Sequence, residues 1–521
     1  MVFRWLVLVL CLGAVGEVQG QKHDYQWLFG YGNSGAATDT DFGGVTIDFN
    51  YSPILINQHI RLADFDEDNV SYSNNNGELL FYSNGGQIFD ARDSIMLDGD
   101  SLNYGELWHS TLVVTGNKFQ GLRIIQGMLA LTYPGDSAYA VLYHYSIRDA
   151  NFPDGLQTGI TDTFYYSSIS LNENNGLGKV IRKNEKLCSD SLAYSQLSAV
   201  RHGNGRDWWI IHPYYRGNCY YTFLLTPHGT SLYEIQCIGG DQMGNSAIST
   251  SCFSPNGEKY FWVNAIDGIH MFDFDRCSGM LSTPQIISFP FATSGDTLGP
   301  ISGIAVSPNN QFLYVSAINF IYQYDLAASD ISASVETIAT WDGTFDPSYP
   351  FANTFFLAQS GPDGKIYFNA AEGTKSLTVV NAPDKKGDSS LVNLHSVKLH
   401  TNNDGSIPNF PNYRLGAQTG SACDTLSTAT QNIRDAREQI LKVFPNPAND
   451  ITTIDYGFTD WNKGPVTLQI TDALGQVVYT QSLPMYSGFQ RLDVSRFSAG
   501  LYNVAIKRGG ATVAVSKLVK Q

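Results

Sequence analysis

Carboxylates at alternating positions are the first residues in this sequence whose spacing suits a chemical role. They are Asp64, Asp66, Glu67 and Asp68, and a calcium loop uses alternate carboxylates as its ligands. The segment lacks the glycine and the distal bidentate glutamate of an EF-hand. We therefore predict a solvated loop in front of the first repeat, and the same prediction covers Asp39 and Asp41.

Histidines and paired aromatic residues form a second group of candidates. His202 and His212 lie on either side of Trp208-Trp209, and Tyr214-Tyr215 follows. The histidines are ten residues apart across a predicted hairpin, a spacing that fixes no metal geometry, so we predict packing or surface histidines. The aromatic pairs have faces that suit sugar stacking, but alternating aromatic residues on strands usually pack between neighbouring repeats.

Cysteine spacing predicts disulfides. The sequence has seven cysteines, and the six that remain without Cys11 are an even number, which suits disulfides in an oxidising compartment. Cys219 and Cys237 lie nine residues on either side of His228, in a Pro-His-Gly turn, so a simple hairpin would place them opposite each other. We predict that bond; by elimination we expect the further pairs Cys252 with Cys277 and Cys188 with Cys423.

Short catalytic motifs are missing from their required structural contexts. We find no nucleophile elbow, zinc-binding helix, phosphate loop or dinucleotide fingerprint in the sequence. An enzyme is therefore less favoured, although sites can be assembled from residues far apart in sequence, which leave no local motif. We expect no cofactor and no metal.

The elements that would position these residues are short strands in a recurring unit. From about residue 60 to residue 400 a short apolar strand, a Gly or Asn turn and an aromatic-rich strand are followed by two more strands. The turn before the aromatic strand returns at Gly205, Gly257, Asn310 and Gly364, at spacings of 52, 53 and 54 residues. Four antiparallel strands per unit are what a β-propeller blade requires.

The repeat count leaves two architectures open for the first part of the chain. Six units can be identified, and a seventh would form if Trp27 to Asn50 paired with strands near Ile407 to Leu415. We predict an all-β protein with a six- or seven-bladed β-propeller over residues 21–415, a linker over 416–440 and a small Ig-like β-sandwich over 441–521. Two stacked β-sandwiches are the alternative to the propeller.

Composition and the N-terminus indicate an exported protein. Residues 1–20 have the pattern of a signal peptide, with a positive end at Arg4, a short apolar run and a cleavage site between Gly20 and Gln21. A lipoprotein at Cys11 is less favoured, because Leu10 stands where a small residue is needed. The net charge of -16 repels phosphate backbones, which argues against nucleic acid as a partner. No later stretch is apolar for the roughly 18 residues that a membrane helix needs.

The last 81 residues carry specific motifs, at Val443 to Ala448, Asp472 to Val478, Leu492 to Ser495, Ala499 to Tyr502 and Lys517 to Val519. Their motif residues are Pro445, Asn446, Pro447, Asp472, Gly475, Gly500, Tyr502 and Lys517. This region resembles the type A C-terminal sorting domain of the type IX (Por) secretion system. The resemblance implies export through the periplasm and outer membrane by that machinery, then removal of the domain with release or surface attachment. An ordinary structural β-sandwich is the alternative.

The large domain is similar to propeller-like proteins of the WD40/YVTN type that often carry this sorting domain. The similarity rests on Asn76 to Gly85, Arg206 to Trp209, Phe272 to Gly279 and Asn412 to Thr425. It implies a fold and no particular activity. Our leading hypothesis is a non-catalytic surface or secreted module that binds an extracellular protein or glycan. The alternatives are a hydrolase or lyase acting on polysaccharide or peptide at the central channel, and a structural surface protein.

Overall fold

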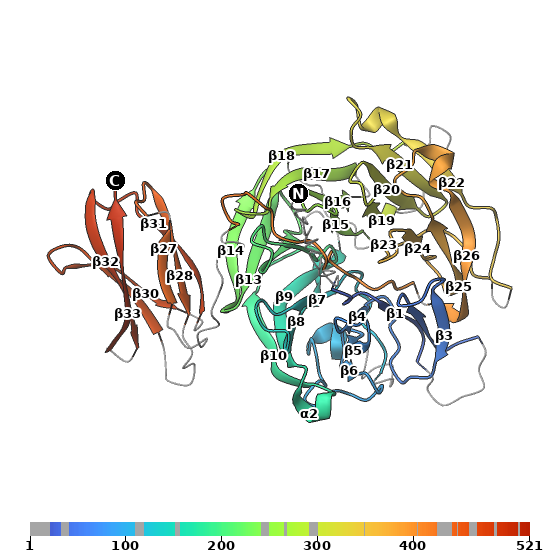
Figure 1. Ribbon diagram of the computed structural model, residues 1–521, viewed down its shortest axis with the longest axis horizontal. Coiled ribbons are helices and arrows are strands. Elements are labelled where there is room, and N and C mark those ends of the chain that lie inside the picture. The colour runs from blue at the N-terminus through green and yellow to red at the C-terminus, as the bar shows by residue number, and fades with distance from the viewer. Residues whose placement is uncertain are drawn as a thin grey trace, which may run out of the picture.

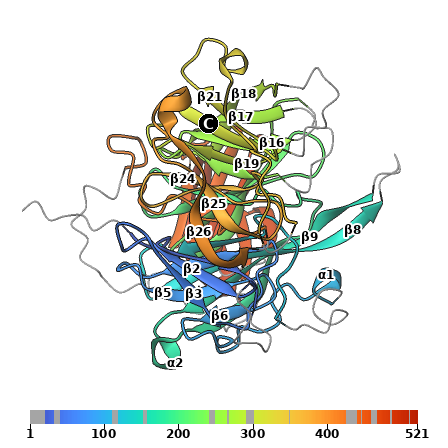
Figure 2. The same cartoon turned by 90° about the vertical axis from the view of Figure 1, so that its right-hand side faces the viewer.

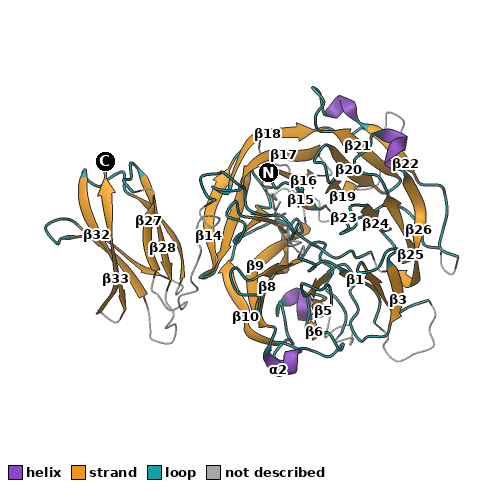
Figure 3. Ribbon diagram, viewed as in Figure 1, coloured by secondary structure: helices purple, strands orange, loops and turns teal. Residues whose placement is uncertain are grey.

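The computed structural model describes residues 21–521 except 33–40, 110–118, 152–156, 241–248, 265–267, 291–300, 348–349, 404, 425–439, 445, 458–465, 484–486 and 509–510. The predicted signal peptide, including Cys11 and Gly20, lies outside the described residues, as do Asp39 and Pro445. Strands make up most of the described chain (Figure 3).

Seven small antiparallel sheets stand side by side in a ring, so the first part of the chain is a seven-bladed propeller (Figure 1). Blades 1 and 2 have three strands each, β1 (Gln26–Gly30), β2 (Gly44–Asp48) and β3 (Leu55–His59), then β4 (Val70–Ser73), β5 (Leu79–Ser83) and β6 (Ile88–Asp90). Blade 3 comprises β7 (Met128–Thr132), β8 (Tyr139–Asn151), β9 (Gln157–Ser170) and β10 (Lys179–Cys188). The β8–β9 hairpin projects beyond the body of the ring (Figure 2).

Blades 4 to 7 each have four strands in sequence order from the centre outward. Blade 4 is β11 (Ser198–Arg201), β12 (Trp208–Pro213), β13 (Cys219–Thr226) and β14 (Gly229–Cys237). Blade 5 is β15 (Ser251–Phe253), β16 (Lys259–Asn264), β17 (Gly268–Asp275) and β18 (Met280–Ile287). Blade 6 is β19 (Ile301–Val306), β20 (Phe312–Ala317), β21 (Phe320–Asp325) and β22 (Glu336–Thr340). Blade 7 is β23 (Ala358–Ser360), β24 (Ile366–Phe368), β25 (Thr374–Val380) and β26 (Val392–Asn403).

The recurring turn has the conformation that its residues predict. Gly205, Gly257, Asn310 and Gly364 have φ angles of 72°, 74°, 63° and 78°, a left-handed region open to Gly and tolerated by Asn. The aromatic strands that follow are buried and pack between blades. Tyr220 of β13, for example, makes an edge contact with Phe272 of β17 at 5.0 Å between ring centroids. Burial of such rings between neighbouring sheets is what holds a repeat ring together.

A seventh blade is present, but the pairing predicted for it, between residues 27–50 and strands near residues 407–415, is wrong. β1 to β3 form their own sheet, and residues 407–415 form no strand. Blade 7 instead meets blade 1 through side chains and loops: Trp27 contacts Tyr367 at 5.3 Å between ring centroids, and the Thr401 hydroxyl donates to the Gly43 carbonyl at 2.7 Å. Pro408 and Pro411 explain the missing strand, because proline has no N–H to give to a ladder.

Among the described residues of the propeller, four short helical turns lie between the strands. They are α1 (Glu106–Trp108), α2 (Glu173–Gly176), η2 (Ser332–Ser334) and η3 (Gly387–Ser390). Within the part of the chain that the structure covers, no helix has the length and apolar character to cross a bilayer.

The C-terminal region is a separate β-sandwich with its own core. One sheet has the order β27 (Ile440–Phe444), β28 (Ile451–Gly457), β31 (Ser487–Asp493), and the other β30 (Val477–Leu483), β29 (Val466–Thr471), β32 (Gly500–Arg508), β33 (Ala511–Lys520). Leu468, Ile470, Val504 and Ile506 are among its fully buried residues. β31 lies beside β14 of blade 4, where Arg491 forms an ion pair with Glu234.

Candidate functional site in the central channel

The centre of the ring is crossed by the chain itself. Residues 405–423, which we name the strap, leave blade 7 and run across the middle of the ring toward the junction of blades 4 and 5 (Figure 1). The strap begins where the Asn369 side chain of blade 7 donates to the carbonyls of Gly405 and Ser406, at 2.6 and 3.1 Å. It contains no strand, so side chains carry most of its hydrogen bonds.

Asn409 anchors the strap to the innermost strands. Its amide nitrogen donates to the carbonyl of Met128 in blade 3 at 2.9 Å and to that of Leu197, next to blade 4, at 3.1 Å. Its backbone N–H reaches the carbonyl of Asn69 beside blade 2 at 3.2 Å. Asn409 is only 7% exposed. One buried side chain therefore satisfies carbonyls of two blades, which would otherwise face the channel unpaired.

Tyr413 continues the contact with blades 2 to 4. Its hydroxyl donates to the carbonyl of Ala130 at 2.6 Å, and its ring makes edge contacts with Trp208 and Tyr72. Burial raises the pKa of Tyr413 well above its usual range, so the hydroxyl stays protonated as the donor that this bond requires.

Asp24 and Arg414 form the main ion pair of the channel. The guanidinium donates to both carboxylate oxygens at 2.7 Å, and the Asp24 side chain is 3% exposed. Burial alone would lower the pKa of Arg414, but the hydrogen-bonded carboxylate outweighs it and the pKa is raised. Such a bidentate pair fixes both charges to each other, and leaves the carboxylate poorly placed to exchange a proton with a substrate.

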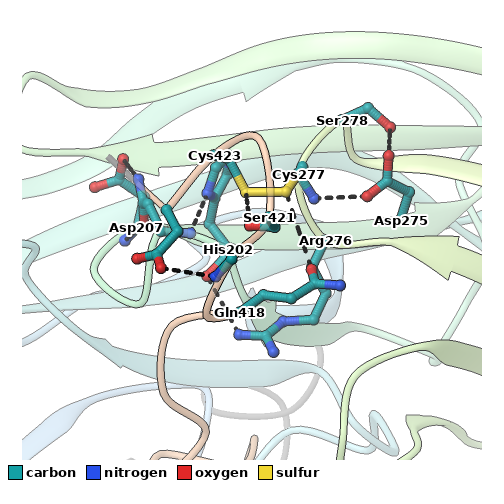
Figure 4. The surroundings of a disulfide bond; sticks show 12 residues. His202, Asp207, Asp275, Arg276, Cys277, Ser278, Gln418, Ser421 and Cys423 are labelled. Atoms are coloured by element: carbon teal, nitrogen blue, oxygen red, sulfur yellow. Dashed lines mark hydrogen bonds between the residues drawn. A yellow bond between two sulfur atoms is a disulfide. The ribbon is translucent and has the colours of Figure 1, made fainter. Parts of the chain in front are cut away.

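A disulfide fixes the far end of the strap to blade 5 (Figure 4). Cys423 is bonded to Cys277, and the N–H of Gln418 donates to the carbonyl of Gly203 at 2.8 Å. Gly203 lies against the bond: a Cβ there would stand 2.4 Å from the sulfur of Cys423. Arg276 holds the same place together, because its guanidinium donates to the carbonyls of Gly416, Arg201 and His202.

The disulfides correct two of the expected pairings. Cys219 and Cys237 are bonded as predicted, opposite each other in the β13–β14 hairpin with Cα atoms 3.9 Å apart. The expected pairs Cys252 with Cys277 and Cys188 with Cys423 are wrong, since Cys277 and Cys423 are bonded to each other and Cys188 and Cys252 are free thiols. Elimination failed because it assumed that all six cysteines form disulfides, whereas two of them are free.

Between the strap and blades 4 to 7 remains a cavity of about 250 Å³. Ala199, Cys252, Ile304 and Ala358 line its inner-strand wall, and the strap closes the other side with Asn409 to Asn412. Pro255, Pro308 and Pro362, which occupy equivalent turns of blades 5, 6 and 7, also line it, together with Pro411. Among the lining residues of the described chain, Asp24 is the single carboxylate.

The predicted histidine and aromatic candidates are packing residues. His212 is fully buried and donates its Nε2–H to the carbonyl of Ala193 at 2.9 Å, and burial lowers its pKa to about 4. His202 stacks on Trp209 at 5.1 Å between ring centroids. Trp208 and Trp209 have no exposed surface, and Tyr215 is 1% exposed, so these rings do not offer faces to a sugar.

The acidic segment is not the solvated loop that we expected. Asp66 and Asp68 are 6% and 1% exposed, because residues 119–123 cover them. Gln120 and Arg123 both donate to Asp66 at 3.1 Å, and the N–H of Asp68 donates to the carbonyl of Leu122. Asp41 is also paired, with Lys375. No group of three or more His, Cys, Asp or Glu in the described chain could hold a metal ion.

The motif residues of the C-terminal sandwich stabilise its fold. Asn446 donates to the carbonyl of Lys517 at 2.7 Å and accepts from the N–H of Val519 at 2.8 Å, so with Pro447 it covers the free edge of β33. Asp472 accepts the N–H groups of Leu474 and Gln476, and Gly475 has φ 83°. Tyr502, two residues after Gly500 at the start of β32, donates its hydroxyl to the carbonyl of Ser498 at 2.8 Å.

This sandwich coincides with a known family model. Residues 442–521 match the family "Secretion system C-terminal sorting domain". The sandwich is a type IX sorting domain. The sorting domain indicates export by type IX secretion to the cell surface or the extracellular space.

Sequence comparison found no curated protein similar to this chain. Among solved structures, a protein from Lactobacillus plantarum is 11% identical over 74% of this chain and 98% of its own, with a TM-score of 0.38. A putative 6-phosphogluconolactonase from Bacteroides fragilis is 11% identical over 74% of this chain and 98% of its own, with a TM-score of 0.40. The Dos1 propeller is 9% identical over 66% of this chain and 87% of its own, with a TM-score of 0.34.

Proposed function

We propose that the mature protein is a non-catalytic interaction module that reaches the outside of the cell through its sorting domain. The observation that carries this proposal is the strap. The channel is where a propeller collects residues from several blades into one site, and here it is crossed by the protein's own chain and held by hydrogen bonds to blades 2, 3, 4 and 5. The carbonyls that converge on the channel therefore accept hydrogen bonds from the strap.

The electrostatics of the channel support a binding role over a hydrolytic one. Glycoside hydrolysis uses a pair of carboxylates on either side of the bond that is cleaved. Asp24 is the single carboxylate lining the cavity among the described residues, and Arg414 occupies both of its oxygens. A hydrolase or lyase acting in the channel would need a free acid or base, and this pair supplies neither.

The test compares binding with turnover for the same preparation. Residues 21–521, secreted into an oxidising compartment, would be screened on glycan arrays and against extracellular proteins of the producing cell. The same sample would be incubated with labelled polysaccharide and peptide substrates. We expect saturable binding and no product. Product formation that disappears in an Asp24→Asn variant would refute the proposal.

Size analysis separates the third hypothesis. A structural surface protein whose partner is itself would elute as an assembly. The interaction module that we propose would elute as a monomer until its partner is added.

A further inference from the structure

The residual cavity of the channel has the character of a ligand site. It measures about 250 Å³, whereas an apolar cavity of about 150 Å³ holds one benzene-sized ring. The space therefore suits a bicyclic ring. Cys252, Phe253 and Ala358 lie on inner strands, yet each is partly exposed. All three residues line this cavity.

Five polar side chains that line the cavity, those of Asp24, Gln126, Asn409, Asn412 and Arg414, are already paired within the protein. Gln126 donates to the carbonyl of Ser251 at 3.0 Å and accepts from its N–H at 2.9 Å. Asn412 donates to the carbonyl of Pro255 at 2.9 Å. Asn409 and the Asp24–Arg414 pair are engaged as described above. A ligand rich in hydroxyl groups would lose its hydrogen bonds to water and regain few in return, which costs free energy.

Four prolines among the lining residues offer apolar rings instead. Pro255, Pro308 and Pro362 recur at the same turn of three adjacent blades, and Pro411 of the strap completes the set. Proline rings and aromatic rings have complementary flat apolar surfaces, as shown by the docking of proline-rich segments on aromatic grooves. No net charge faces the space, because Asp24 and Arg414 neutralise each other.

From these observations we propose that the cavity binds a neutral aromatic small molecule of one or two rings, held between the proline turns and the inner strands of blades 5 to 7. This proposal deepens the proposed function and rests on it, since it assigns a ligand class to the interaction module. Shape and apolar contact provide the affinity. Neutral sugars and charged aromatic acids are excluded from the site by the desolvation of their polar groups.

The test uses the mature chain, residues 21–521, with 5-fluoroindole as the probe and fluorine NMR as the readout. We expect saturable binding that is weakened at least tenfold by Ala358→Trp, which fills the cavity from β23. Methyl glucoside should not compete with the probe. Binding that Ala358→Trp leaves unchanged, no saturable binding at all, or displacement by methyl glucoside would each overturn the proposal.

A gentler double variant guards against misfolding of Ala358→Trp. Pro308→Ser with Pro362→Ser alters two lining prolines only and should weaken binding of the probe severalfold. Pro134→Ser is the matched control, because Pro134 occupies the corresponding turn of blade 3 and does not line the cavity. If the double proline variant and the Pro134→Ser control bind the probe with equal affinity, the role of the proline turns is contradicted.

The thiol of Cys252 gives an independent measurement. In a Cys188→Ser background Cys252 is the free thiol of the described chain. Burial raises the pKa of this thiol, so N-phenylmaleimide should label it slowly, and 5-fluoroindole should lower that rate further. An unchanged rate at saturating probe would overturn the proposal. If Ala358→Trp leaves probe binding unchanged while the chain still captures a macromolecular partner, the aromatic ligand is refuted and the interaction module stands. If the chain turns over a substrate, the proposed function fails by itself.

Discussion

The strap can be tested through Asn409, whose side chain donates to carbonyls on two blades. The substitution Asn409→Asp keeps the size and shape of the side chain but replaces its N–H₂ donor with a carboxylate oxygen. The carbonyls of Met128 and Leu197, at 2.9 and 3.1 Å, then lose their donor. Each buried acceptor left unsatisfied costs about 1–3 kcal/mol. We expect the free energy of unfolding of the propeller to fall by roughly 2–6 kcal/mol, since two acceptors are affected.

The assay is urea denaturation of residues 21–521 at pH 8, followed by tryptophan fluorescence. Trp27, Trp208, Trp209 and Trp262 are fully buried in the propeller and report its unfolding. Asn412→Asp is the matched control, because its amide donates to one carbonyl, that of Pro255, at a less buried position. It should cost about 1 kcal/mol. The m-value should stay constant if both variants unfold the same structure.

A midpoint for Asn409→Asp equal to that of the Asn412→Asp control would refute the reasoning. It would mean that the innermost carbonyls are satisfied without the strap, and that the strap lies loosely in the channel.

Three further predictions concern the disulfides, a buried acid and the sorting domain. Replacing Cys277 and Cys423 with Ser should lower the free energy of unfolding by about 5 kcal/mol, and replacing Cys219 and Cys237 by about 3 kcal/mol, through loop entropy. The two costs differ because the bonded residues are 146 and 18 positions apart. Chemical denaturation measures both costs, and the reverse order would contradict this reasoning. Burial raises the pKa of Asp68 well above its usual range, so the folded protein keeps a proton that the unfolded chain loses above about pH 4. The natural protein therefore loses stability as pH rises, and the Asp68→Asn variant should become more stable relative to it between pH 4 and pH 8. A difference in the free energy of unfolding that does not change with pH would contradict this prediction. Asn446→Ala removes two hydrogen bonds to β33 and should destabilise the sorting domain by about 1–2 kcal/mol and lower the secreted fraction, whereas Leu474→Ser, at an 88% exposed position, should leave the stability unchanged.

Local features of the sequence predicted the blades well. The left-handed turns at Gly205, Gly257 and Gly364 and the Cys219–Cys237 bond depend on residues a few positions apart or on one hairpin. Such features are encoded where they occur, and the repeat spacing then shows how many times they recur.

The strap could not be predicted in the same way. Residues 405–423 have no strand or helix periodicity, and Pro408 and Pro411 signal only an irregular segment. The partners of Asn409 lie 281 and 212 residues earlier in the chain, so no local pattern connects them. Asn409 and Asn412, each directly after a proline, are the one available signal, because their side chains can replace the backbone donors that proline removes.

The prediction for the acidic segment failed for a related reason. Asp66 and Asp68 look like solvent-exposed residues by type, and the residues that cover them come from 119–123. Asp68 also needs room beside it: a Cβ at Gly85 or at Gly127 would stand 2.7 Å from its carboxylate. Those glycines belong to different blades, so the packing is visible only once the ring is assembled.

The placement of Gln21, the expected first residue of the mature chain, has a consequence for how the protein can be handled. Arg201 donates to its side chain at 2.7 Å, and Arg414 of the strap to its backbone carbonyl at 3.5 Å. The first residue of the ring therefore lies beside the strap, the segment by which the chain leaves the ring. A circularly permuted gene, joined by a short peptide from residue 423 to residue 21 and opened in a loop between two blades, would preserve every sheet.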